Sequence, residues 1–324
     1  MKVSLCIITL NEEKNLPECI ESFRGCFDEV IVTDTGSSDN TAAAAKSLGA
    51  KVFQKKWNEN FSDARNFCIS KASGGMILWA DADDRLSPGS AGLIRESALN
   101  SPDYAFTFKI KCLGHKGIGA EAEQIRMFPA NQDIKFSGRV HECVSSSLMQ
   151  KKIPLLKTRA RVNHMEKGRD QSKRTARNKR LIELELSDNP ESPRYNYYYG
   201  NILLSEKRTE DARYYFKKAS NIPSGLSENI SEAALCALAG IDYAGKRKKE
   251  LLENTLKGLK MNKSNTLFLF YLAELCLWQK DFSTALPIYE LIEKSTVSGT
   301  QIPVNLNKLK TVSNGRLREI RNYI

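Results

Sequence analysis

Apolar residues run directly into three carboxylates in the segment 76–84, and this contrast constrains the fold more than any other feature of the chain. The apolar part favours a buried strand, whereas carboxylates are rarely buried unless they are paired or bind a cation. The segment therefore predicts a central strand that ends at a site and presents Asp81 and Asp83 to a metal. Such oxygen ligands suit Mg²⁺ or Mn²⁺, which in turn suit a diphosphate. The alternative is a solvated turn after a strand, because Asp-x-Asp is common.

Residues 2–53 alternate between strand-like and helix-like patterns. The expected elements are strands at 2–10, 29–33 and 51–53 and helices at 16–23 and 42–48. This alternation predicts a parallel sheet with right-handed crossovers. Ligands of such sheets bind beyond the carboxyl ends of the strands. Because Asn11, Glu12, Asp34 and Asp81 all follow such ends, we expect them to converge on one site.

Four motifs carry a resemblance to a known family, and they lie at 4–12, 32–39, 64–66 and 81–84. In order and spacing they resemble the family 2 glycosyltransferases of the GT-A fold. The resemblance implies an α/β, Rossmann-like domain with a mostly parallel sheet. It also implies a nucleotide-diphosphate-sugar donor such as a UDP-sugar, an inverting transfer, and Mn²⁺ or Mg²⁺ as cofactor.

The same resemblance assigns roles to individual residues. Those that would bind the nucleotide sugar are Thr9, Asn11, Glu12, Asp34, Arg65 and Asp81. Asp34 would accept a hydrogen bond from the uracil imide, and Arg65 would lie near the uracil or the diphosphate. Asp81 would contact the ribose or the metal, and Asp83 would ligate the metal. Asp84 stands where the family often has Glu.

Three later segments, 126–129, 136–142 and 162–164, resemble a subgroup with Arg-Leu-Phe, Val-His-Glu and His patterns. That subgroup includes lipopolysaccharide-core glucosyltransferases. It also includes glycosyltransferases with tetratricopeptide repeats, such as the one that modifies a Cys of the bacteriocin sublancin. His164 is then either a third metal ligand, beside Asp81 and Asp83, or a structural residue.

An inverting transfer needs a general base within hydrogen-bond reach of the acceptor and positive charge at the departing diphosphate. Glu142 is the first candidate for the base and His141 is the second. Alternatively, His141 is a buried ring that orients Glu142. The third histidine, His115, lies among glycines and is expected at an exposed hairpin tip.

The chain of 324 residues is long enough for two domains. No apolar run reaches the length of a membrane helix, and the first strand lacks the features of a signal peptide. The eight cysteines are scattered without a Cys-x-x-Cys pair, which favours neither a zinc site nor a disulfide framework. A reducing cytoplasm is the expected compartment.

Positive charge is concentrated in residues 151–180, which hold twelve Lys and Arg against two acids, a balance of +10 out of a net +11. We consider a solvated helix that links two domains, and a basic helix beside the donor diphosphate or an anionic acceptor. Weak contact with anionic lipid is a further possibility. Nucleic acid is not expected, because no interleaved aromatic residues accompany the charge.

From about residue 169 the pattern becomes helical and repeats. Small and aromatic residues recur at the offsets of a tetratricopeptide repeat, and they are Gly200, Ala212, Phe216 and Ala219, then Ala239, Leu251 and Thr255, then Ala273, Ala285 and Tyr289. The connection near 220–231 is expected to be extended. We therefore expect a glycosyltransferase domain at 1–168 and an all-α helical-repeat domain at 169–324.

Three functions follow. The first is transfer of a sugar to a peptide or protein side chain, with the repeats binding the acceptor, or a second copy of this chain, through Tyr195, Tyr198 and Tyr199. The second is transfer to lipopolysaccharide or a lipid-linked glycan at a membrane surface. The third is a non-catalytic repeat scaffold, which the intact carboxylates at 81 and 83 and Glu142 argue against.

Overall fold

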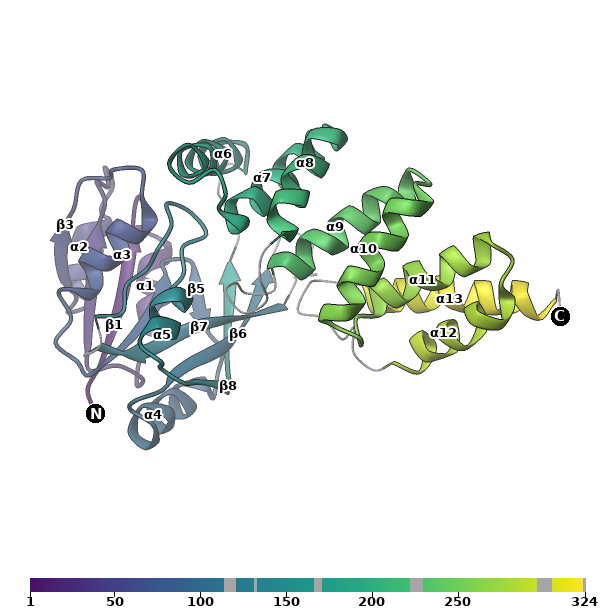
Figure 1. Ribbon diagram of the computed structural model, residues 1–324. Coiled ribbons are helices and arrows are strands. Elements are labelled where there is room, and N and C mark those ends of the chain that lie inside the picture. Colours follow the sequence, from purple (N-terminus) through teal and green to yellow (C-terminus); the bar gives the residue numbers. More distant parts are fainter. Residues whose placement is uncertain (114–120, 131–132, 166–170, 222–229, 296–304, 323–324) are drawn as a thin grey trace. The chain divides into compact units, whose positions relative to one another are not determined.

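The computed structural model describes residues 1–113, 121–130, 133–165, 171–221, 230–295 and 305–322. Two compact units make up the chain, Met1–Leu181 and Ile182–Ile324 (Figure 1). The division falls inside helix α6 (Gln171–Asp188), so the boundary expected at residue 168 lies just before this helix. His115 and residues 222–229 of the expected extended connection lie outside the described residues.

One mixed sheet forms the centre of the N-terminal unit, and within the described residues it has eight strands in the order β3-β2-β1-β4-β7-β6-β8-β5. Their bounds are β1 (Val3–Thr9), β2 (Glu29–Asp34), β3 (Lys51–Gln54), β4 (Met76–Asp81), β5 (Asp84–Leu86), β6 (Ala105–Leu113), β7 (Glu121–Pro129) and β8 (Leu155–Met165). The half formed by β3, β2, β1 and β4 is parallel, which confirms the prediction from the alternating pattern.

The other half of this sheet is mostly antiparallel. β7 runs antiparallel to β4 and β6, and β5 runs antiparallel to β8. β5 begins almost directly after β4 in the sequence, yet it lies at the opposite end of this half of the sheet. β5 can follow β4 in the sequence and still occupy the far end of the strand order because the sheet curls into a half-barrel, which brings β5 close to the end of β4.

Alternate residues of the central strands pack against different helices, as the two-residue period of a strand requires. Leu5 and Ile7 share a core with α1 (Asn15–Ser22), α2 (Thr41–Ser47) and α4 (Ser90–Asn100). Cys6 and Trp79 share the other core with α3 (Phe61–Ile69) and α5 (Ser145–Gln150). Asp81 lies two residues after Trp79 and therefore faces the α3 side.

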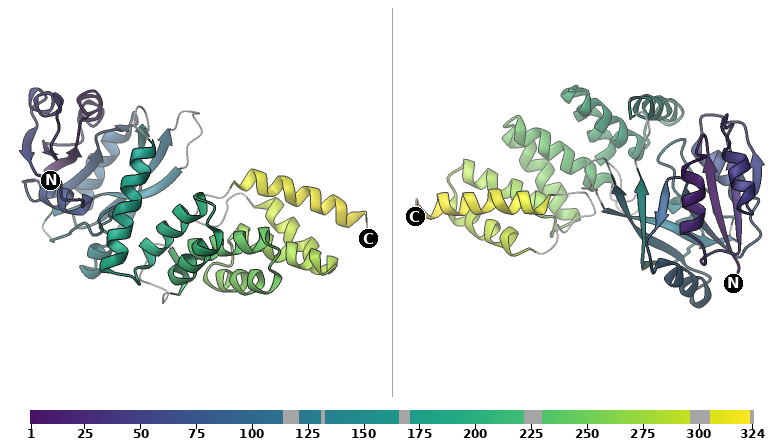
Figure 2. Two further views of the ribbon diagram at one scale, coloured as in Figure 1. Left: turned by 90° about the horizontal axis from the view of Figure 1, so that it is seen from above. Right: turned by 180° about the vertical axis from the view of Figure 1, so that it is seen from behind.

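The C-terminal unit is helical. Its helices are α7 (Pro193–Ser205), α8 (Thr209–Ser220), α9 (Ile230–Ala244), α10 (Lys248–Met261), α11 (Thr266–Trp278), α12 (Phe282–Lys294) and α13 (Leu306–Arg321). Figure 2 shows the pairs α7–α8, α9–α10 and α11–α12 following one another. The residues expected at the repeat offsets are all buried, so the helical-repeat fold is confirmed. Among the described residues, no helix is both long and apolar enough to span a bilayer.

Two expectations need correction. The basic stretch 151–180 is not one helix, because residues 155–165 form β8. Arg159 and Arg161 are exposed there and alternate with buried Ala160 and Val162, so part of the charge lies on one face of a strand and part on α6. Tyr195, expected on a binding surface, is 4% exposed and belongs to the core.

The close packing of α7 on α8 gives a test of the repeat. A Cβ at Gly200 would lie 2.7 Å from the ring of Phe216, which is itself fully buried. We expect Gly200→Ala to destabilise the protein, because overpacking costs about 1–3 kcal/mol and exceeds the helix-propensity gain of up to about 1 kcal/mol.

Gly315 provides the matched control, because it lies in α13 and a Cβ there meets nothing within 4 Å. Thermal unfolding should show a lower Tm for Gly200→Ala and an equal or higher Tm for Gly315→Ala. Equal Tm values for the wild type and both variants would contradict the close approach of α7 and α8.

Candidate active site

The carboxyl ends of β1, β2 and β4 meet at one edge of the sheet, as expected. Thr9 is in register with Asp34, and the neighbouring Ile8 is in register with Asp81. The loops beyond β1 and β2 are joined, since the Asn11 backbone N–H donates to the Ser37 hydroxyl over 2.8 Å. Asn11 adopts a φ of 55°, a left-handed conformation that Asn tolerates better than most residues.

Asp34 is 2% exposed. Its carboxylate accepts hydrogen bonds from the backbone N–H groups of Gly36 (3.1 Å) and Ser37 (2.8 Å) and from the Gln54 amide (3.0 Å). Burial raises the pKa of Asp34, but these hydrogen bonds outweigh burial and lower its pKa below the usual value. An ionised acceptor at the end of β2 suits the predicted contact with an imide N–H.

Two further predicted nucleotide-site residues line this edge. Glu12 is 8% exposed, and its backbone N–H donates to the Thr41 hydroxyl over 2.7 Å. The buried hydroxyl of Thr9 has no hydrogen-bond partner among the described residues. A buried polar atom of this kind suits contact with a ligand.

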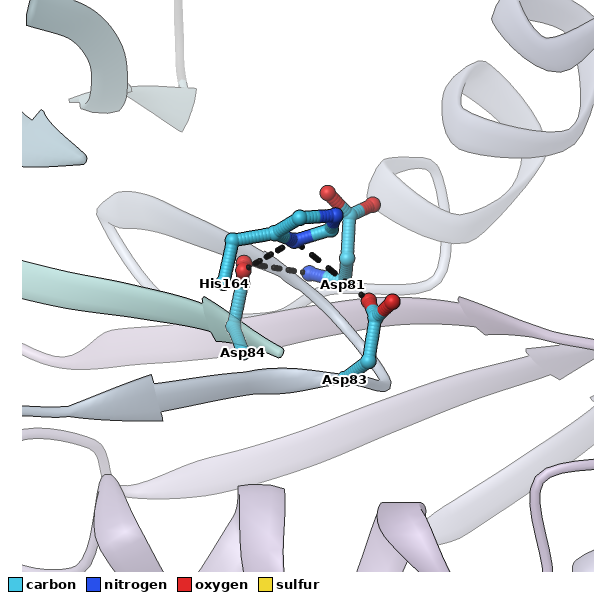
Figure 3. Close-up of side chains that lie close together, drawn as sticks. All are labelled: Asp81, Asp83, Asp84 and His164. Carbon is cyan, nitrogen blue, oxygen red and sulfur yellow. Dashed lines mark hydrogen bonds and ion pairs between the residues drawn. The ribbon is translucent and has the colours of Figure 1, made fainter. Parts of the chain in front are cut away.

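A second group of side chains forms a candidate metal centre. Ligand atoms of Asp81, Asp83, Asp84 and His164 all lie within 4.8 Å of one another (Figure 3). Asp81 ends β4, and Asp84 is the register partner of His164 in the β5–β8 pair. Asp83 is 2% exposed and Asp84 is fully buried. Three carboxylates and one imidazole form a donor set that fits Mn²⁺ or Mg²⁺.

Asp84 organises this cluster, and the sequence did not indicate that role. Its carboxylate accepts from the Asp81 backbone N–H (2.9 Å) and from Arg126 (2.8 Å), and it lies 2.9 Å from Nδ1 of His164. The three consecutive acids were visible in the sequence. The pairing of β5 with β8 that brings His164 to Asp84 was not.

The charge of His164 follows from this setting. Burial lowers the pKa of His164, but the hydrogen bond to Asp84 and the charges of Asp83 and Asp81 outweigh it and raise the pKa to about 9. The imidazole is therefore protonated near neutral pH. A metal ion that binds its ring nitrogen must displace that proton.

Arg126 is a second residue whose role the sequence did not reveal, although its motif was noted. Besides Asp84, its guanidinium lies 3.8 Å from Asp81 and 3.9 Å from the centre of the Trp79 ring. Burial raises the pKa of Asp81, but the charges of Arg65 and Arg126 outweigh burial and lower it well below the usual range. Asp81 therefore stays ionised.

Helix α3 is tied to the segment 136–143 along its length. Asn66 exchanges two hydrogen bonds with the backbone of Phe136, at 2.8 and 2.9 Å. The Ser62 hydroxyl donates to the Gly138 carbonyl over 2.6 Å. Ser137 and Cys143 exchange backbone hydrogen bonds and close this loop. The loop therefore presents Glu142 to α3.

Arg65 of α3 joins Glu142 to the carboxylate cluster. Its Nε donates to Glu142 over 2.5 Å and its Nη2 donates to Asp81 over 2.6 Å. The Glu142 side chain is 10% exposed. His141, the second candidate base, is exposed and has a φ of 53°. The structure thus brings Glu142 to the cluster by way of Arg65.

Two buried cationic groups at this site keep hydrogen-bonding capacity. Arg65 Nη1 and Arg126 Nε are buried and find no acceptor among the described residues. A buried N–H without an acceptor is costly. Guanidinium groups bind phosphate oxygens well, so both suit an anionic ligand beside the candidate metal centre.

A curled mixed sheet with a carboxylate cluster at the end of its parallel strands is the arrangement of a GT-A domain. Residues 4–154 match the family described as Glycosyl transferase family 2. The N-terminal unit of this chain therefore contains a family 2 glycosyltransferase domain.

Two relatives match this chain over more than this domain. A TPR repeat-containing protein of Synechococcus elongatus is 35% identical over 244 residues, which cover 72% of this chain and 59% of the relative. The glycosyltransferase SunS of Bacillus subtilis is 32% identical over 225 residues, which cover 66% of this chain and 52% of SunS. The matched part of this chain thus spans little more than half the length of these relatives.

Solved structures with a similar chain course include S. aureus TarS 1-349 in complex with UDP, at 16% identity and a TM-score of 0.43 over 80% of this chain and 88% of that one. A glucosyl-3-phosphoglycerate synthase from Mycobacterium tuberculosis, in complex with Mn²⁺ and UDP-glucose, has 16% identity and a TM-score of 0.41 over 57% of this chain and 78% of that one.

The candidate metal centre predicts a metal-dependent affinity for nucleotide. Asp83→Ala should reduce Mn²⁺ affinity at least about tenfold, since losing one well-placed charged ligand costs more than about 1.4 kcal/mol. It should weaken UDP binding chiefly when Mn²⁺ or Mg²⁺ is present.

Isothermal titration calorimetry with and without metal measures both effects. Asp211→Ala is the control, because Asp211 is an aspartate of the C-terminal unit that pairs with Arg208 at 2.8 Å and lies outside the cluster. If wild type and Asp83→Ala showed the same metal-dependent UDP affinity, the cluster would not be the metal site.

Proposed function

We propose that this chain is a divalent-metal-dependent, inverting glycosyltransferase that moves a sugar from a UDP-sugar to a peptide or protein side chain. The observation that carries the proposal is the link between the carboxylate–imidazole cluster and Glu142 through Arg65. Donor activation and base catalysis need groups that are this close together. The family 2 domain at residues 4–154 supports the same reaction class.

Each group has a chemical task in a single displacement at the anomeric carbon. Asp81, Asp83 and His164 would hold Mn²⁺ or Mg²⁺, which supplies positive charge to the departing diphosphate. Arg65 and Arg126 add fixed positive charge beside it. Glu142 takes the proton from the attacking acceptor atom as the new bond forms on the face opposite the leaving group.

The nucleotide end of the donor occupies the edge formed by β1 and β2. Thr9, Asn11 and Glu12 bind the nucleoside, and Asp34 accepts from the uracil imide N–H. The ionised, buried carboxylate of Asp34 supports this assignment. The hydroxyl of Thr9 supports it as well, because it has no partner among the described residues.

The helix pairs of the C-terminal unit bind the acceptor. Stacked tetratricopeptide-type pairs form surfaces that bind peptides, and the relative in Synechococcus carries the name of such a repeat protein. An aromatic group on α7 and α8 suits this role, because Tyr199 packs on Tyr215 at 4.7 Å and Tyr215 packs on Tyr214 at 5.2 Å. Tyr214 is 58% exposed.

The second candidate function is transfer to a lipid-linked glycan or lipopolysaccharide at a membrane surface. The basic residues of the exposed face of β8 and the first turns of α6 favour it. Sedimentation with liposomes of neutral lipid, and of neutral plus anionic lipid, separates the two. Binding that requires anionic lipid would support the lipid acceptor, and no binding would support the peptide acceptor.

The proposed reaction is tested first on the donor. Purified protein with Mn²⁺ is incubated with a panel of nucleotide sugars, and release of the nucleotide is measured. Mass spectrometry of candidate peptides then detects the transferred sugar. If none of these donors is hydrolysed or used for transfer, the result would favour a non-catalytic scaffold.

The role of Glu142 as base predicts a loss of turnover. At saturating donor and Mn²⁺, Glu142→Gln should reduce turnover about 10²- to 10⁴-fold, the usual contribution of a positioned base. His141→Ala should reduce it much less, since that side chain is exposed. Steady-state kinetics of both variants decide between them, and the reverse pattern would make His141 the base.

The acceptor surface predicts a change in KM. Tyr214→Ala should raise the KM for a peptide acceptor about tenfold, the effect of removing an aromatic side chain worth about 1.4 kcal/mol. UDP-sugar hydrolysis should stay unchanged. Leu291→Ala is the control, because Leu291 is similarly exposed, at 53%, but lies on α12. Equal KM values for both variants would show that α7 and α8 do not form part of the acceptor surface.

A further inference from the structure

Arg65 is shared between two carboxylates with different tasks. Its Nη2 donates to Asp81 in the candidate metal centre, and its Nε donates to Glu142, the proposed base. The residue is 5% exposed. One guanidinium thus forms two charge-assisted hydrogen bonds, which are stronger than neutral ones when buried.

The surroundings of Arg65 hold the guanidinium in place between these partners. It lies 4.2 Å from the centre of the Trp79 ring and 5.5 Å from that of Phe136. Asn66, the next residue of α3, clamps the backbone of Phe136. Helix α3, the loop and the Trp79 ring are thus fixed to one another. A change in the attraction between Arg65 and one of its two carboxylates therefore alters the ion pair between Arg65 and the other.

We propose that Arg65 is a positioning residue that couples occupancy of the metal centre to the placement of Glu142. The inference rests on the function proposed above. A cation at Asp81 takes up part of the negative charge that attracts Nη2, and the guanidinium is then held more by Glu142. Conversely, when residue 142 is neutral, Arg65 forms an ion pair with Asp81 alone, and its positive charge there weakens binding of the cation. Linkage makes the two effects equal in size.

This coupling is measured by a double-mutant cycle on Mn²⁺ affinity alone. The four proteins are the wild type, Glu142→Gln, Arg65→Gln and the double variant, and the readout is the dissociation constant from calorimetry or electron paramagnetic resonance. We expect Glu142→Gln to weaken Mn²⁺ binding about 3- to 10-fold, a usual coupling within one ion-pair network. In the Arg65→Gln background the same change should have little effect.

The cycle separates the proposal from simple electrostatics. If Glu142 attracted Mn²⁺ directly through space, its neutralisation would weaken binding in both backgrounds, and more strongly without Arg65. Asp63→Asn is the matched control, because Asp63 also lies on α3 but pairs with Lys55 at 2.8 Å. It should leave Mn²⁺ affinity unchanged with either residue at position 65.

A second variant guards against loss of fold, because Arg65 is buried in ion pairs. Arg65→Lys keeps the charge but lacks the planar fork that reaches two carboxylates. Glu142→Gln should then weaken Mn²⁺ binding less than it does beside Arg65. An undiminished effect of Glu142→Gln in both the Arg65→Lys and the Arg65→Gln backgrounds would overturn the proposal.

Failure of this inference and failure of the proposed function give different results. Mn²⁺ binding that depends on Asp83, with equal effects of Glu142→Gln in all backgrounds, would reject the coupling and leave the transferase proposal standing. Coupling in the Mn²⁺ cycle without sugar transfer to any acceptor would support the coupling and reject the transferase proposal. Absence of Mn²⁺ binding in the wild type would overturn both the metal dependence and the coupling.

Discussion

The N-terminal site depends on the burial of Asp84. A carboxylate with no exposed surface is unfavourable unless it is ionically paired and hydrogen-bonded. Arg126, His164 and the backbone N–H of Asp81 meet that requirement from three different strands. Removing one partner from a buried pair of this kind typically costs about 3–5 kcal/mol. The same contacts place Asp81 and Asp83 beside His164, so the stability of the half-barrel and the geometry of the candidate metal centre have one cause.

A second constraint comes from the union of α3 with the loop 136–143. Side chains of Ser62, Arg65 and Asn66 all bond to that loop. An Arg and an Asn on one turn of helix therefore have separate tasks: the amide fixes the loop, and the guanidinium joins the loop's Glu142 to Asp81. The motif at 64–66 therefore arranges the candidate site through contacts within the protein.

The C-terminal unit is built on different principles. Small residues at fixed offsets allow α7, α9 and α11 to approach their partner helices. The pairs also share buried acids: Glu274 accepts from the Tyr243 and Tyr289 hydroxyls and from Arg316. These contacts join successive helices into one unit. The exposed Tyr214 is therefore carried by an array of helices that are joined through buried contacts.

Much of this protein follows from its sequence. Alternating strands and helices predicted the parallel half of the sheet, and the candidate site residues at the strand ends converge because parallel strands meet there. Small-residue offsets predicted the helix pairs, because close helix packing leaves no room for larger side chains. These features depend on neighbours in the chain or on a short period, and such information is local.

Only the tertiary structure decided the rest. The pairing of β5 with β8 joins Asp84 to His164 across 80 residues, and the curl of the sheet that permits it leaves no periodic trace in the sequence. The position of Arg65 between Asp81 and Glu142, and that of Arg126 over Trp79, likewise depend on how distant segments pack. The residues of the candidate site could be predicted from the sequence, but their partners could not, because long-range pairing is set by the whole core.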